Sequence, residues 1–358
     1  MKNNLVRVGT HRNSNIELFR IILMFLIVSH HYVVNSGMME IMAENPFAPN
    51  SLFFYIFGAW GKTAINGFVM ITGYFMCKSQ ITLRKFLKLI FQIMFYNVLI
   101  YIFFVIMGYS CFSFSKFIVV VFPVKQVGGD FVSAFILFYL FIPFLNLLIK
   151  HLDEKMYLRL IILCLFLYTC LGNMPKIPVL MNYVSWFIVI YFIAAYVRLY
   201  PKDFFSKTYI WGYATLSCLL VSCISIVVCL YIGTDQYYFI SDSNKVLAIA
   251  TAFCAFMYFK NIRLKYNKLI NFIASASFGV LLIHANSDTM RQWLWIDTLH
   301  NTFFFNTGWC YLHFVYSVIC IYAICTGIDL LRIYLLEKPL FKFLDKYIFP
   351  KVINKRYQ

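Results

Sequence analysis

Three ionisable side chains lie on one face of the first long apolar stretch of the chain. Arg20 and His31 are eleven residues apart, which in an α-helix leaves them within about 20° of whole turns and roughly 16 Å apart along the axis. Glu17 lies three residues before Arg20, about 40° from the same line. A histidine exchanges a proton near neutral pH, and an arginine attracts anions. The pattern therefore predicts proton-transfer chemistry on a negatively charged substrate.

The depth of these residues in a membrane span indicates how such a substrate would lie. Charged groups inside spans usually face the interior of a helix bundle. Arg20 is expected near the cytosolic boundary and His31 beyond the middle of the span. Acetyl-coenzyme A, held at Arg20 by its phosphates, would reach His31 with its thioester arm, and His31 would act as general base on a hydroxyl. The alternative is that Glu17 and Arg20 snorkel to the interface and His31 bonds a backbone group.

The composition predicts that these residues lie in a helical membrane protein. Hydrophobic residues make up 62% of the 358 residues and charged residues 13%, against roughly 45–50% and about 25% in soluble domains. We therefore expect an all-α fold, a polytopic membrane protein with about ten transmembrane helices. The 11 cysteines are odd in number and show no paired spacing, so neither a disulfide framework nor a metal site is expected.

Ten apolar runs are candidates for spans, because charged residues, prolines and glycines separate them. The expected spans are residues 16–36, 52–76, 86–108, 130–149, 157–172, 183–199, 209–232, 245–259, 269–287 and 309–331. The shorter run 112–124 is expected to be re-entrant or interfacial, since an eleventh span would disturb the distribution of charge. The first run holds Glu17 and Arg20 and shows no small-residue cleavage site, so we expect a retained span and no signal peptide.

Basic residues indicate which side faces the cytosol. With ten spans and the N-terminus inside, 25 of the 31 lysine and arginine residues fall in cytosolic segments, as the positive-inside rule predicts. Six remain on the outer side: Lys62, Lys116, Lys125, Lys176, Lys245 and Arg291. Both termini are therefore expected in the cytosol, and residues 1–358 are expected to form one membrane domain. The net charge of +17 follows from this topology, so no nucleic-acid partner is needed.

The sequence around Arg20 and His31 resembles a known family. The stretch RNSNIELFRIILMFLIVSHHY (residues 12–32) is similar to the first helix of the acyltransferase-3 family. The hallmark of that helix is an arginine followed, after ten residues, by a histidine, and Arg20 and His31 match it. The stretch WGKTAINGFVMITGYFM (60–76) is similar to a second family segment, with Thr72 in place of the usual serine.

Three further segments extend the resemblance, in the expected order, along nearly the whole chain. They are VSAFILFYLFIPFLNLLI (132–149), SWFIVIYFIAAYVRLYP (185–201) and FGVLLIH (278–284). The resemblance implies ten spans with both ends inside, and transfer of an acyl group, commonly acetyl, from cytosolic acyl-CoA to a sugar hydroxyl. It implies that His31 is the catalytic residue and that Arg20 is its partner.

The family also has basic residues after its second span. Arg84, Lys85 and Lys88 stand at that place, with one arginine where the family usually shows two. Their charge and location fit the phosphates of coenzyme A. Ordinary positive-inside residues are the alternative. The donor substrate is thus expected to be acetyl-CoA or another acyl-CoA, with no metal.

Three residues are further candidates for substrate binding, namely Glu17, His284 and Arg291. His284 is expected in the outer half of the ninth span, where it would orient substrate, pair with His31 or be an ordinary bundle histidine. Arg291 has aromatic and acidic neighbours, which suit either a sugar site or an aromatic belt at the interface. These neighbours are Asp288, Trp293, Trp295 and Asp297.

Together these features favour an O-acetyltransferase, and the resemblance to the family implies the bacterial cytoplasmic membrane. Its acceptor would be a cell-envelope or exopolysaccharide glycan, or the lipid-linked precursor, and it would work alongside polysaccharide assembly proteins. The rival is a transporter or flippase of lipid-linked saccharide, whose polar residues would line a path. The sequence shows no repeat symmetry and few mid-span breaks in support of that rival. A third alternative is a non-catalytic assembly or sensor protein with the family fold.

Overall fold

The fold is entirely helical in the part of the chain that the structure describes. The computed structural model describes residues 13–125, 129–177 and 179–349, and none of these residues lies in a strand. Six helices are long and apolar enough to cross a membrane, or seven if one bent pair is taken as a single span. The predicted all-α fold class and its membrane character are confirmed. An all-helical fold suits lipid, because a helix satisfies its own backbone hydrogen-bonding groups.

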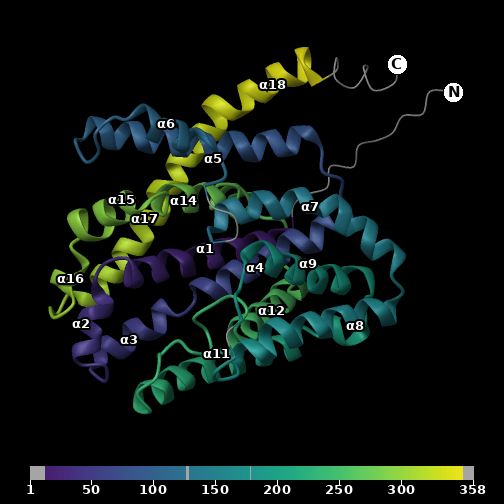
Figure 1. The fold of residues 1–358 in the computed structure, drawn as a ribbon, viewed down its shortest axis with the longest axis horizontal. Helices are drawn as coiled ribbons and strands as arrows, with labels where there is room; N and C mark the ends of the chain where they lie inside the picture. The colour runs from purple at the N-terminus through teal and green to yellow at the C-terminus, as the bar shows by residue number, and fades with distance from the viewer. Residues whose placement is uncertain (1–12, 126–128, 178, 350–358) are drawn as a thin grey trace.

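The α-helices follow one another along the chain and are labelled as in Figure 1. They are α1 (Ser14–Val34), α2 (Met38–Glu44), α3 (Pro49–Gly58), α4 (Gly61–Met76), α5 (Leu83–Ile106), α6 (Phe114–Val121), α7 (Phe131–His151), α8 (Glu154–Leu165), α9 (Tyr183–Leu199), α10 (Asp203–Ser206), α11 (Thr208–Tyr231), α12 (Val246–Asn261), α13 (Lys268–Ala274), α14 (Ser277–His284), α15 (Asp288–Arg291), α16 (Asn301–Phe304), α17 (Cys310–Arg332) and α18 (Lys338–Tyr347). The segments Phe166–Cys170, Gln292–Thr298 and Ile333–Glu337 are π-helical, and Leu171–Asn173 is a 3₁₀ turn.

Each of the ten predicted runs contains helix, but two of the runs are broken. Run 52–76 forms α3 and α4, which Ala59 and Trp60 separate, and run 269–287 forms α13 and α14. The residues at both breaks are apolar or small, so hydropathy does not reveal them. The run 112–124 contains only the short α6, none of whose side chains is buried. The count of ten spans stays a prediction.

The orientation of the bundle also stays a prediction. Some of the basic residues on which it rests lie outside the described residues, namely Lys2, Arg7, Arg12, Lys351, Lys355 and Arg356. The terms "cytosolic" and "outer" refer to this predicted orientation, in which α1 begins at the cytosolic end.

Helix α1 lies in the middle of the bundle (Figure 1). It packs against α3, α4, α12, α13, α14 and α17. Glycine permits the close approach of α4, since a Cβ atom at Gly67 would lie 2.7 Å from the Leu23 side chain of α1. On the charged face of α1, Glu17 is buried and Arg20 and His31 are partly buried, which is the environment expected for ionisable groups at this depth.

Polar side chains set where several helices begin. An N-cap side chain accepts a hydrogen bond from a backbone N–H in the first turn of α5, α7, α8, α9 and α13. These N-cap residues are Thr82, Asp130, Asp153, Asn182 and Asn267. Asp130 thereby caps α7 at the edge of a cavity that His31 also lines.

Candidate active site

His31 lines a cavity at the outer end of α1. The cavity has a volume of about 260 Å³ and is bounded by α1, the start of α4 and α9, the approach to α7, and the region around α14 and α15. Its polar lining comes from side chains far apart in the sequence. They are His30, His31, Lys62, Asn97, Lys125, Asp130, Tyr183, Asn286 and Arg291. The cavity therefore places a histidine among many hydrogen-bonding groups.

His31 is joined to His284 by a hydrogen bond of 3.0 Å, from Nδ1 of His31 to Nε2 of His284. The other nitrogen of His284, Nδ1, lies 2.6 Å from the carbonyl oxygen of Val280. Because a carbonyl oxygen only accepts, Nδ1 of His284 carries a hydrogen, and Nε2 of the neutral ring accepts. Nδ1 of His31 must then donate, which leaves Nε2 of His31 free of hydrogen. The pair is thus arranged to accept a proton at Nε2 of His31.

The neighbouring His30 has a different environment. Its Nδ1 lies 2.5 Å from the carbonyl oxygen of Gly58, at the break between α3 and α4. Gly61 packs directly against the imidazole ring, and any side chain at this position would collide with it. His30 therefore links α1 to the broken second run, because its Nδ1 bonds the Gly58 carbonyl oxygen, a backbone group at the end of α3.

Arg20 lines a separate cavity, nearer the cytosolic end of α1. This cavity has a volume of about 220 Å³, and aromatic and small side chains line most of it. Glu17 is buried, and its carboxylate lies 3.7 Å from the Arg20 guanidinium. Arg20 and His31 do not line the same cavity, but Phe131 and Leu281 line both. The structure thus places the two residues of the motif in adjoining spaces.

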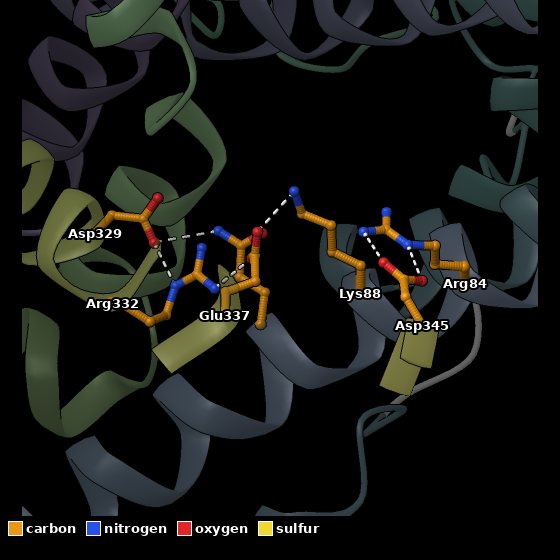
Figure 2. A network of polar contacts seen from close by, with 7 residues as sticks. Arg84, Lys88, Asp329, Arg332, Glu337 and Asp345 are labelled. Carbon is orange, nitrogen blue, oxygen red and sulfur yellow. Dashed lines mark hydrogen bonds and ion pairs between the residues drawn. The ribbon is translucent and has the colours of Figure 1, made fainter. Parts of the chain in front are cut away.

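Two of the three basic residues after the second run line another cavity, at the cytosolic end of the bundle. Arg84 and Lys88 line this space of about 620 Å³, together with Lys268, Lys338 and Lys342 of α13 and α18. Figure 2 shows how two of these cations are engaged: Arg84 pairs with Asp345 at 2.8 Å, and Lys88 pairs with Glu337 at 2.6 Å. Lys85 lies outside the lining and donates to Ser79 and to the carbonyl oxygen of Gln80.

A buried charged network beside this cavity was not evident from the sequence. Arg332 pairs with Asp329 at 2.7 Å and with Glu337 at 2.6 Å, and all three side chains are at most 4% exposed (Figure 2). Asp329 also accepts hydrogen bonds from Gln92 and Tyr96 of α5. The signal available was the Asp–Arg spacing of three residues at the end of the last run, which favours a pair on one helix face.

The aromatic neighbours of Arg291 pack against other side chains of the bundle. Trp295 is fully buried, and Trp293 packs edge-on against Phe103 and Phe104. Neither tryptophan lines the His31 cavity, whereas Arg291 does. Arg291 is therefore the member of this cluster that faces the histidine pair.

The comparison with protein families agrees with this arrangement. A family model described as an acyltransferase domain matches residues 13–331, which include the histidine pair and Arg20. The chain belongs to the acyltransferase-3 family. Among curated proteins and among solved structures, none matches the chain. Family membership makes the chain a multi-pass membrane acyltransferase, and it confirms the resemblance noted around Arg20 and His31.

The acyltransferase-3 match ends at residue 331, and part of the lining of the cytosolic cavity comes from residues after it. Arg332, Glu337, Asp345 and the whole of α18 lie beyond it. The histidine pair and the Arg20 cavity thus belong to the shared acyltransferase domain. The carboxylates that engage Arg84 and Lys88 come from the segment after that domain.

Proposed function

We propose that the chain transfers an acyl group, commonly acetyl, from cytosolic acyl-CoA to a hydroxyl of a cell-envelope or exopolysaccharide glycan or its lipid-linked precursor. His31 is the general base in this proposal. The protein would lie in the bacterial cytoplasmic membrane with ten spans and both termini in the cytosol. The observation that carries the proposal is a set of three neighbouring cavities, with cations in the first and His31 in the last.

The cavities adjoin through shared residues. Ser275 lines both the cytosolic cavity and the Arg20 cavity. Phe131 and Leu281 line both the Arg20 cavity and the His31 cavity. The Arg20 and His31 cavities lie along α1, and the cytosolic cavity neighbours the first of them. A long, narrow substrate with unlike ends would fit this set of cavities better than a compact one.

The character of each cavity matches one part of acyl-CoA. Phosphates suit the cytosolic cavity, because its lining has five basic side chains against two carboxylates, those of Glu337 and Asp345. The slender pantetheine arm suits the Arg20 cavity, whose lining is mostly apolar. The neutral thioester would then lie near His31. Arg20 lies roughly 16 Å along the helix from His31, so in this proposal it acts on the donor and does not touch the reacting carbonyl.

The histidine pair supplies the proton transfers. Nε2 of His31 takes the proton of the acceptor hydroxyl as the oxygen attacks the thioester carbonyl carbon. The tetrahedral intermediate collapses, the C–S bond breaks, and the CoA thiolate takes the proton back from Nε2. Throughout, Nδ1 of His31 donates to His284, which holds the ring in place and stabilises its protonated form. The sum is an ester plus free CoA, with no covalent enzyme intermediate.

In this proposal the side chain of Asn97 stabilises the oxyanion of the intermediate. It is buried at the cavity wall, and its amide oxygen accepts a hydrogen bond of 3.1 Å from Asn286. Its NH₂ group is therefore left to donate. A fixed amide donor in a site of low polarity stabilises developing negative charge more strongly than water does.

The test of the proposed function follows label from acetyl-CoA into glycan. Membranes with and without the protein receive radiolabelled acetyl-CoA, and envelope glycan is then extracted. We expect base-labile label in the glycan only where the protein is present. Absence of label, together with glycan export that still depends on the protein, would reject acyl transfer and favour the flippase.

Neutralising the cytosolic cavity should weaken the binding of the donor. For the double variant Arg84→Gln, Lys88→Gln, we expect the KM for acetyl-CoA to rise about tenfold or more, because each charge-assisted contact to phosphate contributes about 1–3 kcal/mol. The KM for acetyl-pantetheine, which has no nucleotide phosphates, should not change. Steady-state transfer with both donors measures the difference.

Lys85→Gln is the matched control, because Lys85 lies in the same stretch but outside the cavity lining. Its KM for acetyl-CoA should stay near the wild-type value. An equal rise in all these variants would instead assign the effect to the general positive charge of this face.

A further inference from the structure

Basic residues on the predicted outer side gather around the histidine pair. Six are expected on that side, and four of them line either the His31 cavity or a second cavity that shares Asn97, Lys125 and Asn286 with it. These four residues are Lys62, Lys116, Lys125 and Arg291. The positive-inside rule accounts for few basic residues on this side, but it gives no reason for those few to converge on one place.

Negative charge is scarce in the walls of these two cavities. The second cavity, of about 400 Å³, lies between α5 and α6, and none of the described residues in its lining is acidic. In the His31 cavity the described lining contains one carboxylate, that of Asp130. Its Oδ2 is occupied, since it accepts hydrogen bonds from the backbone N–H and hydroxyl of Ser133 at 2.8 and 2.7 Å. The combined wall therefore carries an excess of positive charge.

The carboxylates that pair with two of the cations lie outside the wall. Asp242 is 3.5 Å from Nζ of Lys62, and Asp288 is 2.8 Å from Nη1 of Arg291. The side chains of these two aspartates are 46% and 98% exposed, so solvent screens much of their charge. Nε of Arg291 is buried and has no hydrogen-bond partner among the described residues. The hydrogen-bonding capacity of this guanidinium is thus not fully used by the described residues.

Lys116 on α6 and Lys125 just after it have even less negative charge nearby. Among the described residues, no carboxylate lies within ion-pair distance of Lys116 or Lys125. Lys125 is exposed, but desolvation by the nearby protein still lowers the pKa of its ammonium group, and Asp130 opposes this only in part. An anion bound here would relieve the uncompensated charge.

The donor does not account for these cations. In the proposed function, the phosphates of acyl-CoA stay in the cytosolic cavity, and only the neutral thioester reaches His31. A neutral sugar does not account for them either, since it carries no negative charge that would compensate them. The partner that remains is the acceptor. Fixed cations around a cleft attract and orient a substrate of opposite charge.

We propose that the acceptor carries an oxyanion, either a carboxylate or a phosphate, close to the hydroxyl that is acylated, and that Lys62, Lys125 and Arg291 bind it. Lys116 extends the cationic surface into the second cavity, along which a charged glycan would continue. This inference rests on the proposed function and narrows its acceptor from glycans in general to acidic glycans.

The first test asks which sugar receives the label. Glycan labelled from acetyl-CoA by membranes containing the full-length protein is cut into repeat units, which are separated by anion exchange. We expect the label in units that carry negative charge. Amidation of carboxylates with a carbodiimide should neutralise those units if the oxyanion is a carboxylate, and cold aqueous hydrofluoric acid should do so if it is a phosphate. Label confined to neutral units would overturn the inference while leaving acyl transfer intact, and no label at all would reject the proposed function.

The second test removes the cations. The variants Lys125→Gln and Arg291→Gln should each lower transfer at limiting acceptor about tenfold, with the KM for acetyl-CoA unchanged. Lys245→Gln is the control, because Lys245 is also expected on the outer side but lines a separate cavity. Its transfer rate should match the wild type. Loss in the control equal to that in the two variants, or full transfer in both variants, would contradict binding of the acceptor by these cations.

Discussion

Replacing His31 with glutamine should lower acyl transfer about 10²–10⁴-fold, the range expected when a general base is removed. Glutamine fills similar space, and its amide NH₂ is able to donate to Nε2 of His284 in place of the lost ring. It offers no group that accepts a proton near neutral pH, so the acceptor hydroxyl would have to attack without assistance. Single-turnover transfer of label at saturating acetyl-CoA, normalised to the amount of protein in the membrane, measures the loss.

His30→Gln is the matched control for this variant. The two histidines are neighbours on α1, but Nδ1 of His30 bonds the Gly58 carbonyl oxygen and does not contact His284. We expect the rate of the chemical step in this variant to stay within a few-fold of the wild type, even where the protein is less stable. A comparable loss in both variants would show that packing of α1, and not proton transfer at His31, limits the reaction.

Local patterns were sufficient to find Arg20, His31 and the ten helical runs. Hydropathy reports the apolar face of each helix within a single stretch of sequence, and the spacing of Arg20 and His31 depends only on the helix that carries both. The structure has both on α1, where each side chain is partly buried. Their roles in the reaction stay predictions until the variants are measured.

Contacts between distant segments were beyond the same reasoning. His31 and His284 are 253 positions apart, and only the packing of α14 against α1 brings their nitrogens to 3.0 Å. The tautomer of His31 follows from the Val280 carbonyl oxygen, a partner that no sequence pattern identifies. Hydropathy likewise passed over the break at Ala59 and Trp60, because both residues are apolar.

The basic residues after the second run show a different limit. The sequence grouped Arg84, Lys85 and Lys88 by charge, but helical geometry points them in different directions. Arg84 and Lys88 line the cytosolic cavity, whereas Lys85 turns toward Ser79 and Gln80. The acids that engage the first two come from the far end of the chain, at Glu337 and Asp345. Pairing of this kind depends on how α18 packs against α5, which local sequence does not encode.

Replacing Arg332 with methionine should destabilise the protein by about 3–5 kcal/mol, the range for removing one partner from a buried charged network. Arg332 is the cation between Asp329 and Glu337, and the three side chains are almost fully buried. Methionine keeps much of the apolar volume but leaves Asp329 without a charged partner and Glu337 with Lys88 alone. The fraction of protein that stays monodisperse in detergent after heating, measured over a range of temperatures, reports the loss.

Arg84→Met provides the comparison that isolates burial. Arg84 and Asp345 also form a close pair, at 2.8 Å, but their side chains are 48% and 44% exposed, and exposed pairs contribute at most about 1 kcal/mol. The midpoint temperature, at which half of the protein stays monodisperse, should therefore fall far less than in Arg332→Met. Adding Asp329→Asn and Glu337→Gln to Arg332→Met should recover part of the loss, because no buried charge is then left unpaired. Equal midpoints for the two single variants, or no recovery in the triple variant, would mean that Arg332 stabilises the bundle by packing and not by compensating these carboxylates.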